Sequence, residues 1–153
     1  MVEIAPSHLR GFLVVRVITI KRPRKMFKVL DNQQRKTIKR FLVKSIGHIK
    51  NQKKPCIVDG VLKYQAVVDG KNLCCPIGVH LSEKDAKFLQ DNDFKANNMP
   101  IDIIDTLLPR VQEEEARVFL DLIQKAHDYP ALYKKSDFLN CFLVFANAIK
   151  ILL

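Results

Sequence analysis

The chain has 153 residues, 48% of them hydrophobic, and a formal net charge of +10. This length is enough for one hydrophobic core and too short for two domains that each have a core of ordinary size. The charge is divided unevenly, because residues 1–54 hold fifteen Lys and Arg with two acids, whereas residues 55–153 hold eleven with fourteen acids. A concentrated positive field attracts acidic proteins or nucleic acids and says nothing about the fold.

The first 25 residues differ in composition from the rest of the chain. Residues 12–20 are rich in β-branched side chains and predict a strand, which the basic cluster at 21–25 interrupts. This apolar run is too short to cross a bilayer, and the basic cluster follows it instead of preceding it as in a signal peptide. We therefore expect a cytoplasmic protein in which residues 1–25 are a basic extension, either disordered or foreign to the natural product, and residues 26–153 form a single domain.

A basic helix is predicted next. Asp31 can cap a helix that runs to about residue 51, because apolar residues and Ser45 recur at helical spacing from Ile38 to Ile49. Basic side chains populate the rest of its surface. The candidate partner-binding residues are four of these side chains: Lys36, Lys39, Arg40 and Lys44.

Residues 55–76 predict a small antiparallel β-meander of short strands. The pairs Asp59-Gly60 and Asp69-Gly70 supply the positive φ angles that tight hairpin turns require. After this region the pattern is helical, so that the fold class is expected to be α+β and mostly α, with the meander packed against four or five helices.

The four cysteines, which are Cys56, Cys74, Cys75 and Cys141, are expected to be thiols, because no export signal is present. Adjacent side chains in a strand point to opposite faces, so one member of the Cys74 and Cys75 pair is expected in the core.

Four helices are predicted beyond Gly78. Ser82 can cap a short helix over 82–91, and a further helix covers 101–108. Pro109 is expected in the first turn of a long helix with Glu113, Glu114 and Glu115 near its positive end, and this helix ends at residues 124–128. Ser136 or Asp137 is expected to cap the last helix. Most side chains of this helix are apolar around its whole circumference, so it is expected to be largely buried or to contact a partner.

A basic helix, a hairpin, a Cys-Pro-Ile-Gly turn and a helix ending in Gln-Lys-Ala-His-Asp follow one another here. This succession resembles a group of short, functionally uncharacterised bacteriophage and bacterial proteins, in which a Tyr-bearing strand leads to Cys-x-x-Gly and a nearby Leu or Ile. The matching residues are Tyr64, Cys75, Gly78 and Leu81. The resemblance covers about residues 30–150, whereas Cys74 and the extension 1–25 depart from it. It implies a small accessory protein of a T-even-like phage and assigns no catalytic residue.

Two alternatives involve chemistry. Cys75 and His127 can in principle pair as nucleophile and base. The apolar residues around Cys75 favour a buried structural thiol instead. His127 is expected near the end of its helix, where its ring can hydrogen-bond to the last backbone carbonyls. Cys74, Cys75 and His80 supply fewer than the four ligands that a structural zinc site requires. The three adjacent glutamates are explained by the favourable interaction of negative side chains with the positive end of the helix dipole, without a bound cation. We therefore expect no enzyme and no catalytic, cofactor or metal residue.

Three readings of the basic segment stay open: a solvated face, an acidic protein partner, or a nucleic acid. No recognition motif for nucleic acids is present, and only Phe27 and Phe41 lie near the charges. The expected function is a non-enzymatic accessory protein that binds a host macromolecule, in the first place a protein, during infection. The alternative is sequence-independent nucleic-acid binding through the basic N-terminal third.

Overall fold

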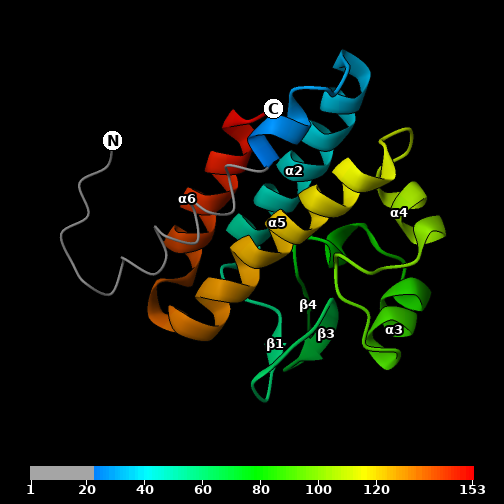
Figure 1. Ribbon diagram of the computed structural model, residues 1–153. Coiled ribbons are helices and arrows are strands. Elements are labelled where there is room, and N and C mark those ends of the chain that lie inside the picture. The colour runs from blue at the N-terminus through cyan, green and yellow to red at the C-terminus, as the bar shows by residue number, and fades with distance from the viewer. Residues whose placement is uncertain (1–22) are drawn as a thin grey trace.

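Three long helices, α2 (Asn32–Gln52), α5 (Glu113–Tyr133) and α6 (Phe138–Ile151), lie side by side and supply much of the core (Figure 1). This computed structural model describes residues 23–153. The strand expected at 12–20 lies outside the described residues, as does most of the extension. Helix predominates and the few strands are antiparallel, so the predicted α+β, mostly α class is confirmed.

Helix α2 begins and ends where local chemistry dictates. The Asp31 carboxylate accepts the Gln34 backbone N–H at 2.8 Å, and the Asp31 N–H donates to Gln34 Oε1 at 2.9 Å. This reciprocal capping box satisfies two backbone donors at the helix start. Lys53, in the left-handed conformation with φ of 63°, ends the helix. The predicted cap and length of this helix are therefore confirmed.

In the described part of the chain, the strands form two separate two-stranded sheets instead of one continuous meander. They are β1 (Ile57–Val58) with β2 (Val61–Leu62), and β3 (Gln65–Val68) with β4 (Lys71–Cys74). Asp59, Gly60, Asp69 and Gly70 all have positive φ, which confirms both predicted turns.

The two sheets are separate because neighbouring backbone groups of the connecting residues form hydrogen bonds to different hairpins. The Lys63 N–H donates back to the Cys56 carbonyl at 3.0 Å, whereas the Tyr64 carbonyl accepts the Cys75 N–H at 2.9 Å. Each bond extends a different hairpin by one residue. The chain therefore passes from one hairpin to the other at this point, and β2 does not pair with β3.

The short helices after the sheets agree with the sequence. The Ser82 hydroxyl accepts the Asp85 N–H at 3.0 Å and caps α3 (Glu83–Asp91). Helix α4 (Ile101–Leu107) follows, and a 3-10 turn, η2 (Gly78–His80), precedes α3. Both predicted helices are confirmed.

The predicted bounds of α5 are wrong at both ends. Arg110 has φ of 65°, which interrupts helical geometry, so Pro109 lies in a turn and the helix begins at Glu113. The three glutamates do occupy its first turn. At the other end the helix passes through Pro130 to Tyr133. Proline lacks the N–H for one helical bond, but Pro130 and Ala131 are buried, and packing against α6 maintains the last turn.

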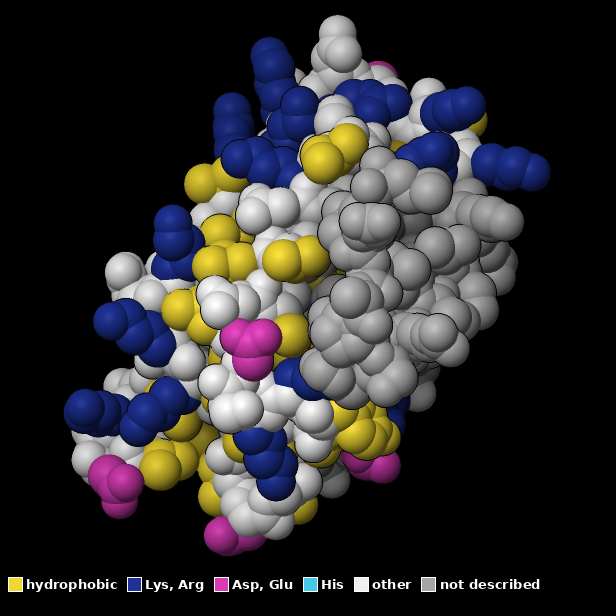
Figure 2. Space-filling view, turned by 90° about the vertical axis from the view of Figure 1, so that its left-hand side faces the viewer, with side chains coloured by type: hydrophobic (Ala, Val, Ile, Leu, Met, Phe, Trp, Pro, Cys, Tyr) yellow, Lys and Arg dark blue, Asp and Glu magenta, His cyan; other side chains and the backbone are white. Residues whose placement is uncertain are grey.

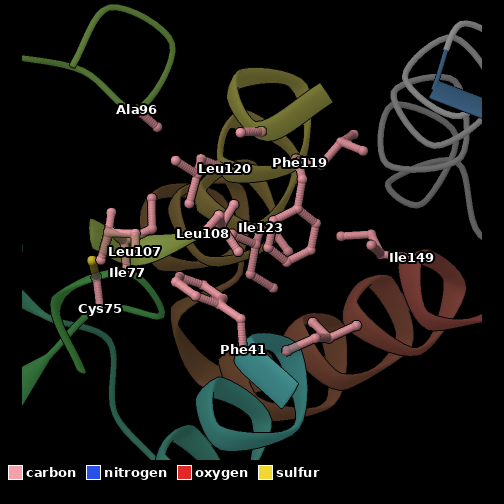
Figure 3. Close-up of a cluster of buried hydrophobic side chains, with 14 of the residues drawn as sticks. Phe41, Cys75, Ile77, Ala96, Leu107, Leu108, Phe119, Leu120, Ile123 and Ile149 are labelled. Atoms are coloured by element: carbon pink, nitrogen blue, oxygen red, sulfur yellow. The ribbon is translucent and has the colours of Figure 1, made fainter. Parts of the chain in front are cut away.

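Helix α6 follows the 3-10 turn η3 (Lys135–Asp137). Asp137 stands at the cap position, as one of the two predicted candidates, but its side chain bonds the Asn140 amide at 2.9 Å and no backbone N–H. The apolar faces of α2, α5 and α6 meet in the cluster of Figure 3, where Phe41 and Phe119 pack edge to face with ring centroids 5.5 Å apart.

Candidate functional site

The four predicted partner-binding residues project from one exposed side of α2. Spacings of three and four residues place Lys36, Lys39, Arg40 and Lys44 on a single stripe, and all four side chains are exposed. We call these four residues the basic face. The apolar residues of α2 are buried on the other side of the helix. The structure thus brings the four residues together, while their role in binding stays a prediction.

No carboxylate neutralises the basic face within residues 23–153, where every ion pair lies on α3, on α5 or in the loop after α3. Residues 23–54 hold eleven Lys and Arg against one acid, Asp31. Like charges four residues apart, such as Lys36 with Arg40, destabilise a helix by about 0.2–0.5 kcal/mol per pair. The charges on this face therefore do not serve the stability of α2.

Figure 2 shows where the positive charge lies on the surface. Lys and Arg side chains gather at the end of the molecule where α2 begins, at the top of Figures 1 and 2, and others follow along one edge. Since few acidic side chains lie among them in this view, the positive field at this end is largely uncompensated.

Arg35, also on α2, has a different role from the basic face. Its guanidinium donates to the main-chain oxygens of Leu30 at 3.2 Å, Phe27 at 2.5 Å and Leu153 at 3.5 Å. These bonds connect α2 to the helical residues 23–27 and to the end of α6. Arg35 is therefore a structural residue and is excluded from the candidate site.

Two uncharged residues complete this surface. Val43 is 53% exposed, and a Cβ at Gly47 would contact nothing within 4 Å. Glycine inside a helix is less stable than alanine by about 1 kcal/mol, so the described fold does not require it here. Phe27 and Phe41 are buried, at 0% and 4% exposure, and neither can stack on a nucleic-acid base.

The alternative pair, Cys75 and His127, lies in one hydrogen-bonded chain without direct contact. The Cys75 thiol donates to Gln124 Oε1 at 3.3 Å, and Gln124 Nε2 donates to Asp128 Oδ1 at 2.8 Å. His127 Nδ1 lies 2.8 Å from the same carboxylate oxygen. An amide and a carboxylate thus separate the thiol from the imidazole.

Both nitrogens of the His127 ring are already in use. Nε2 lies 2.9 Å from the Cys56 backbone nitrogen, which can only donate, so Nε2 accepts and the ring proton is on Nδ1, facing Asp128. The side chain is fully buried and stands six residues before the end of α5. The predicted role at a helix end is therefore wrong, because His127 bonds the first hairpin instead of the last carbonyls of its own helix.

Burial makes the thiols poor nucleophiles. Burial raises the pKa of Cys75 well above its usual value, and the Asp128 charge raises it further. Burial, followed by the effect of Cys74, raises the pKa of Cys56 to about 12. All four cysteines are free thiols, and Cys75 is fully buried while Cys74 is half-buried, which confirms that one member of the pair lies in the core. This setting disfavours the thiolate that nucleophilic attack requires.

A polar contact beneath the basic face was not anticipated. His80 stacks on Phe41 with ring centroids 3.6 Å apart, and its Nε2 lies 2.9 Å from Ser45 Oγ. The carbonyls of Pro76, at 2.7 Å, and of Phe41, at 3.0 Å, can only accept from Ser45 Oγ, and the single hydroxyl proton is directed to them, so the tautomer that fits this site has the imidazole Nε2–H donating to Ser45. Burial is the main cause that lowers the pKa of His80 to about 4, and the Lys44 charge adds to it. The one signal in the sequence was Ser45 on the apolar stripe of α2.

Residues 23–153 contain neither a metal-binding cluster nor a membrane-spanning helix. No three His, Cys, Asp or Glu side chains there gather closely enough to hold a metal ion. In the same part of the chain, no helix combines the length and apolar character needed to cross a membrane.

Comparison with known proteins gives no match to a protein-family model, to a curated protein or to a solved structure. The resemblance to small phage and bacterial proteins therefore stays a prediction. The site is defined by its own geometry: an exposed basic helix face, supported from below by the Ser45 and His80 contact.

Proposed function

We propose that this chain is a non-enzymatic binding protein whose basic face contacts an acidic surface of another protein. One observation carries the proposal: four exposed cations share one side of α2, and no carboxylate within residues 23–153 pairs with them. An acidic partner would supply the missing counter-charge and relieve the repulsion along the helix. Val43 offers a small apolar contact at the centre of this surface.

The nature of the partner follows from the sequence resemblance. A small accessory protein of a phage acts inside an infected bacterium, so the proposed partner is an acidic host protein. Electrostatic association of this kind is fast and weakens as salt increases. Catalysis is not part of the proposal, because the Cys75 thiol is buried and both ring nitrogens of His127 are already hydrogen-bonded, so the two side chains are not available as nucleophile and base.

The test compares two variants with the same net charge. The first changes each residue of the basic face to glutamine, and the control does the same at four exposed lysines on other elements: Lys71, Lys84, Lys135 and Lys150. Tagged proteins are incubated with nuclease-treated bacterial lysate, and captured proteins are quantified by mass spectrometry. We expect the wild type and the control to retain one acidic partner that the basic-face variant loses, with similar thermal unfolding of all three. Equal recovery by all three proteins would remove the proposal.

Duplex nucleic acid is the second candidate, and a specific observation favours the duplex over a single strand. Phe27 and Phe41 are buried, so neither of these two rings offers a platform on which an unpaired base could stack near the charges. Phosphates need only cations and close approach, and Gly47 presents no side chain on the surface of α2. Four phosphate contacts would give a salt slope of about −3.6 in log–log form. A mobility-shift titration with a flat salt response would exclude this candidate.

A further inference from the structure

A second surface lies away from the basic face, where the first hairpin approaches α5 and the segment after α3. A cavity of about 540 Å³ opens there, lined by residues of segments 61–64, 89–97 and 121–128. This volume falls within the range of small-molecule sites, about 300–1,000 Å³. Its inner wall is formed in part by the core residues Tyr64, Leu89 and Ala96, and no residue of the basic face lines it.

Asp128 lines the cavity and is held in place from behind. Its Oδ1 accepts from Gln124 Nε2 and from His127 Nδ1, both at 2.8 Å, and His127 is itself fully buried. Its other carboxylate oxygen has no hydrogen-bond partner within residues 23–153, and the side chain is 28% exposed. A carboxylate fixed by buried donors, with one oxygen free, is suited to bind a cationic group.

Lys63, on the hairpin side of the cavity, is the complementary charge. It is half-buried and forms no ion pair within the described residues. The other two lysines of the lining have partners, since Lys125 lies 2.8 Å from Asp121 and Lys95 lies 3.7 Å from Asp93. Once these pairs cancel, the described lining presents the Lys63 ammonium, which has no ion-pair partner there, and the second oxygen of Asp128, which accepts no hydrogen bond there.

Gln90 and Phe94 supply further features of the lining. Gln90 Oε1 accepts the Gln65 N–H at 2.9 Å, which leaves the amide NH₂ group free to donate to an anion. Phe94, which is half-buried, also lines the cavity. The cavity therefore combines a cation-binding oxygen, anion-binding donors and an apolar wall, as small-ligand sites do.

We infer that this cavity binds a small zwitterion of the free α-amino-acid class. The ammonium group of the ligand pairs with the free oxygen of Asp128, its carboxylate meets Lys63 and the Gln90 amide, and its side chain packs against Phe94. Binding here is independent of the basic face, because the two surfaces share no residue.

The test uses the full chain and the standard L-amino acids at millimolar concentration, with binding followed by amide chemical shifts. At least one amino acid is expected to shift resonances of the lining residues. Its decarboxylated and its N-acetylated analogues, which each lack one charge, are expected to bind at least tenfold more weakly. An absence of shifts at the lining, or equal binding of either analogue, would overturn the inference.

Variants then assign the contacts. Asp128→Asn keeps an oxygen for Gln124 and His127 but removes the charge, and Lys63→Gln removes the other charge. Each is expected to weaken amino-acid binding at least tenfold, whereas Lys84→Gln, at an exposed lysine on α3 outside the lining, changes it less than threefold. Unchanged affinity in Asp128→Asn with native thermal unfolding would contradict the proposed contact. The basic-face variant is expected to bind the amino acid as the wild type does, so failure of either proposal is distinguishable.

Discussion

The main-chain carbonyl of Tyr64 lies in the space that any side chain at Gly78 would occupy. The same carbonyl accepts the Cys75 N–H at 2.9 Å, and the Gly78 N–H lies 3.2 Å from the Cys75 sulfur. The Tyr, Cys and Gly of the sequence motif thus form one packed junction between the second hairpin and η2. Their spacing serves the fold and requires no catalytic explanation.

Gly78→Ala is expected to lower the free energy of unfolding by about 3 kcal/mol or more, because the backbone of Tyr64 must move to admit a methyl group. Gly47→Ala is the matched control, since its Cβ would contact nothing, and it is expected to raise stability by about 1 kcal/mol. Urea denaturation of both variants measures the difference. Changes of the same sign and size would contradict the structure at this junction.

His127→Leu is expected to lower the free energy of unfolding by about 2–3 kcal/mol, because it leaves the buried Cys56 N–H without an acceptor. His48→Leu is the control, at a half-buried site where the ring contacts Gln52 Oε1 at 2.8 Å, and a loss below about 1 kcal/mol is expected. Thermal and urea unfolding of both variants provide the comparison. A loss in His127→Leu no larger than that in the control would show that His127 does not hold the hairpin.

Alkylation of the native protein is expected to modify Cys74 before the two fully buried thiols, Cys56 and Cys75. Burial raises the pKa of all three, but only Cys74 is half-buried. Peptide mass spectrometry after brief exposure to iodoacetamide gives the order. Rapid modification of Cys75 would instead indicate an accessible, activated thiol and would reopen the enzymatic alternative.

The lowered pKa of His80 leads us to expect that the free energy of unfolding decreases on mild acidification. Its pKa is about 4 in the folded protein and 6.5 ordinarily, so below pH 6.5 the unfolded chain binds a proton that the folded protein refuses. The stabilisation is complete above pH 6.5 and disappears as the pH falls towards 4. His80→Gln keeps a donor for Ser45 but does not titrate, so its urea midpoint should change less over this range. Parallel curves for the two proteins would contradict the assignment.

Local signals in the sequence were sufficient for several elements. Asp31 with Gln34 defines the start of α2, and the two Asp-Gly pairs define both hairpin turns, because each device acts within a few residues. The exposed stripe of the basic face also follows from helical spacing alone. These features depend on neighbours along the chain, which a single sequence displays.

Features that depend on tertiary packing could not be predicted in the same way. Pro130 is a helix breaker by local rules, yet buried contacts carry α5 past it. The bond from Cys56 to His127 joins positions 71 residues apart, and that from Cys75 to Gln124 spans 49. No periodicity links such distant residues. The cavity beside Asp128 was missed for the same reason.

The decisive measurement is the affinity of the captured partner for the wild type, the basic-face variant and the equally charged control, determined over a range of salt concentrations. The basic-face variant is expected to bind far more weakly than the other two proteins, with an affinity that depends less on salt. Equal weakening in the control and the basic-face variant would show that net charge, and not this face of α2, determines binding.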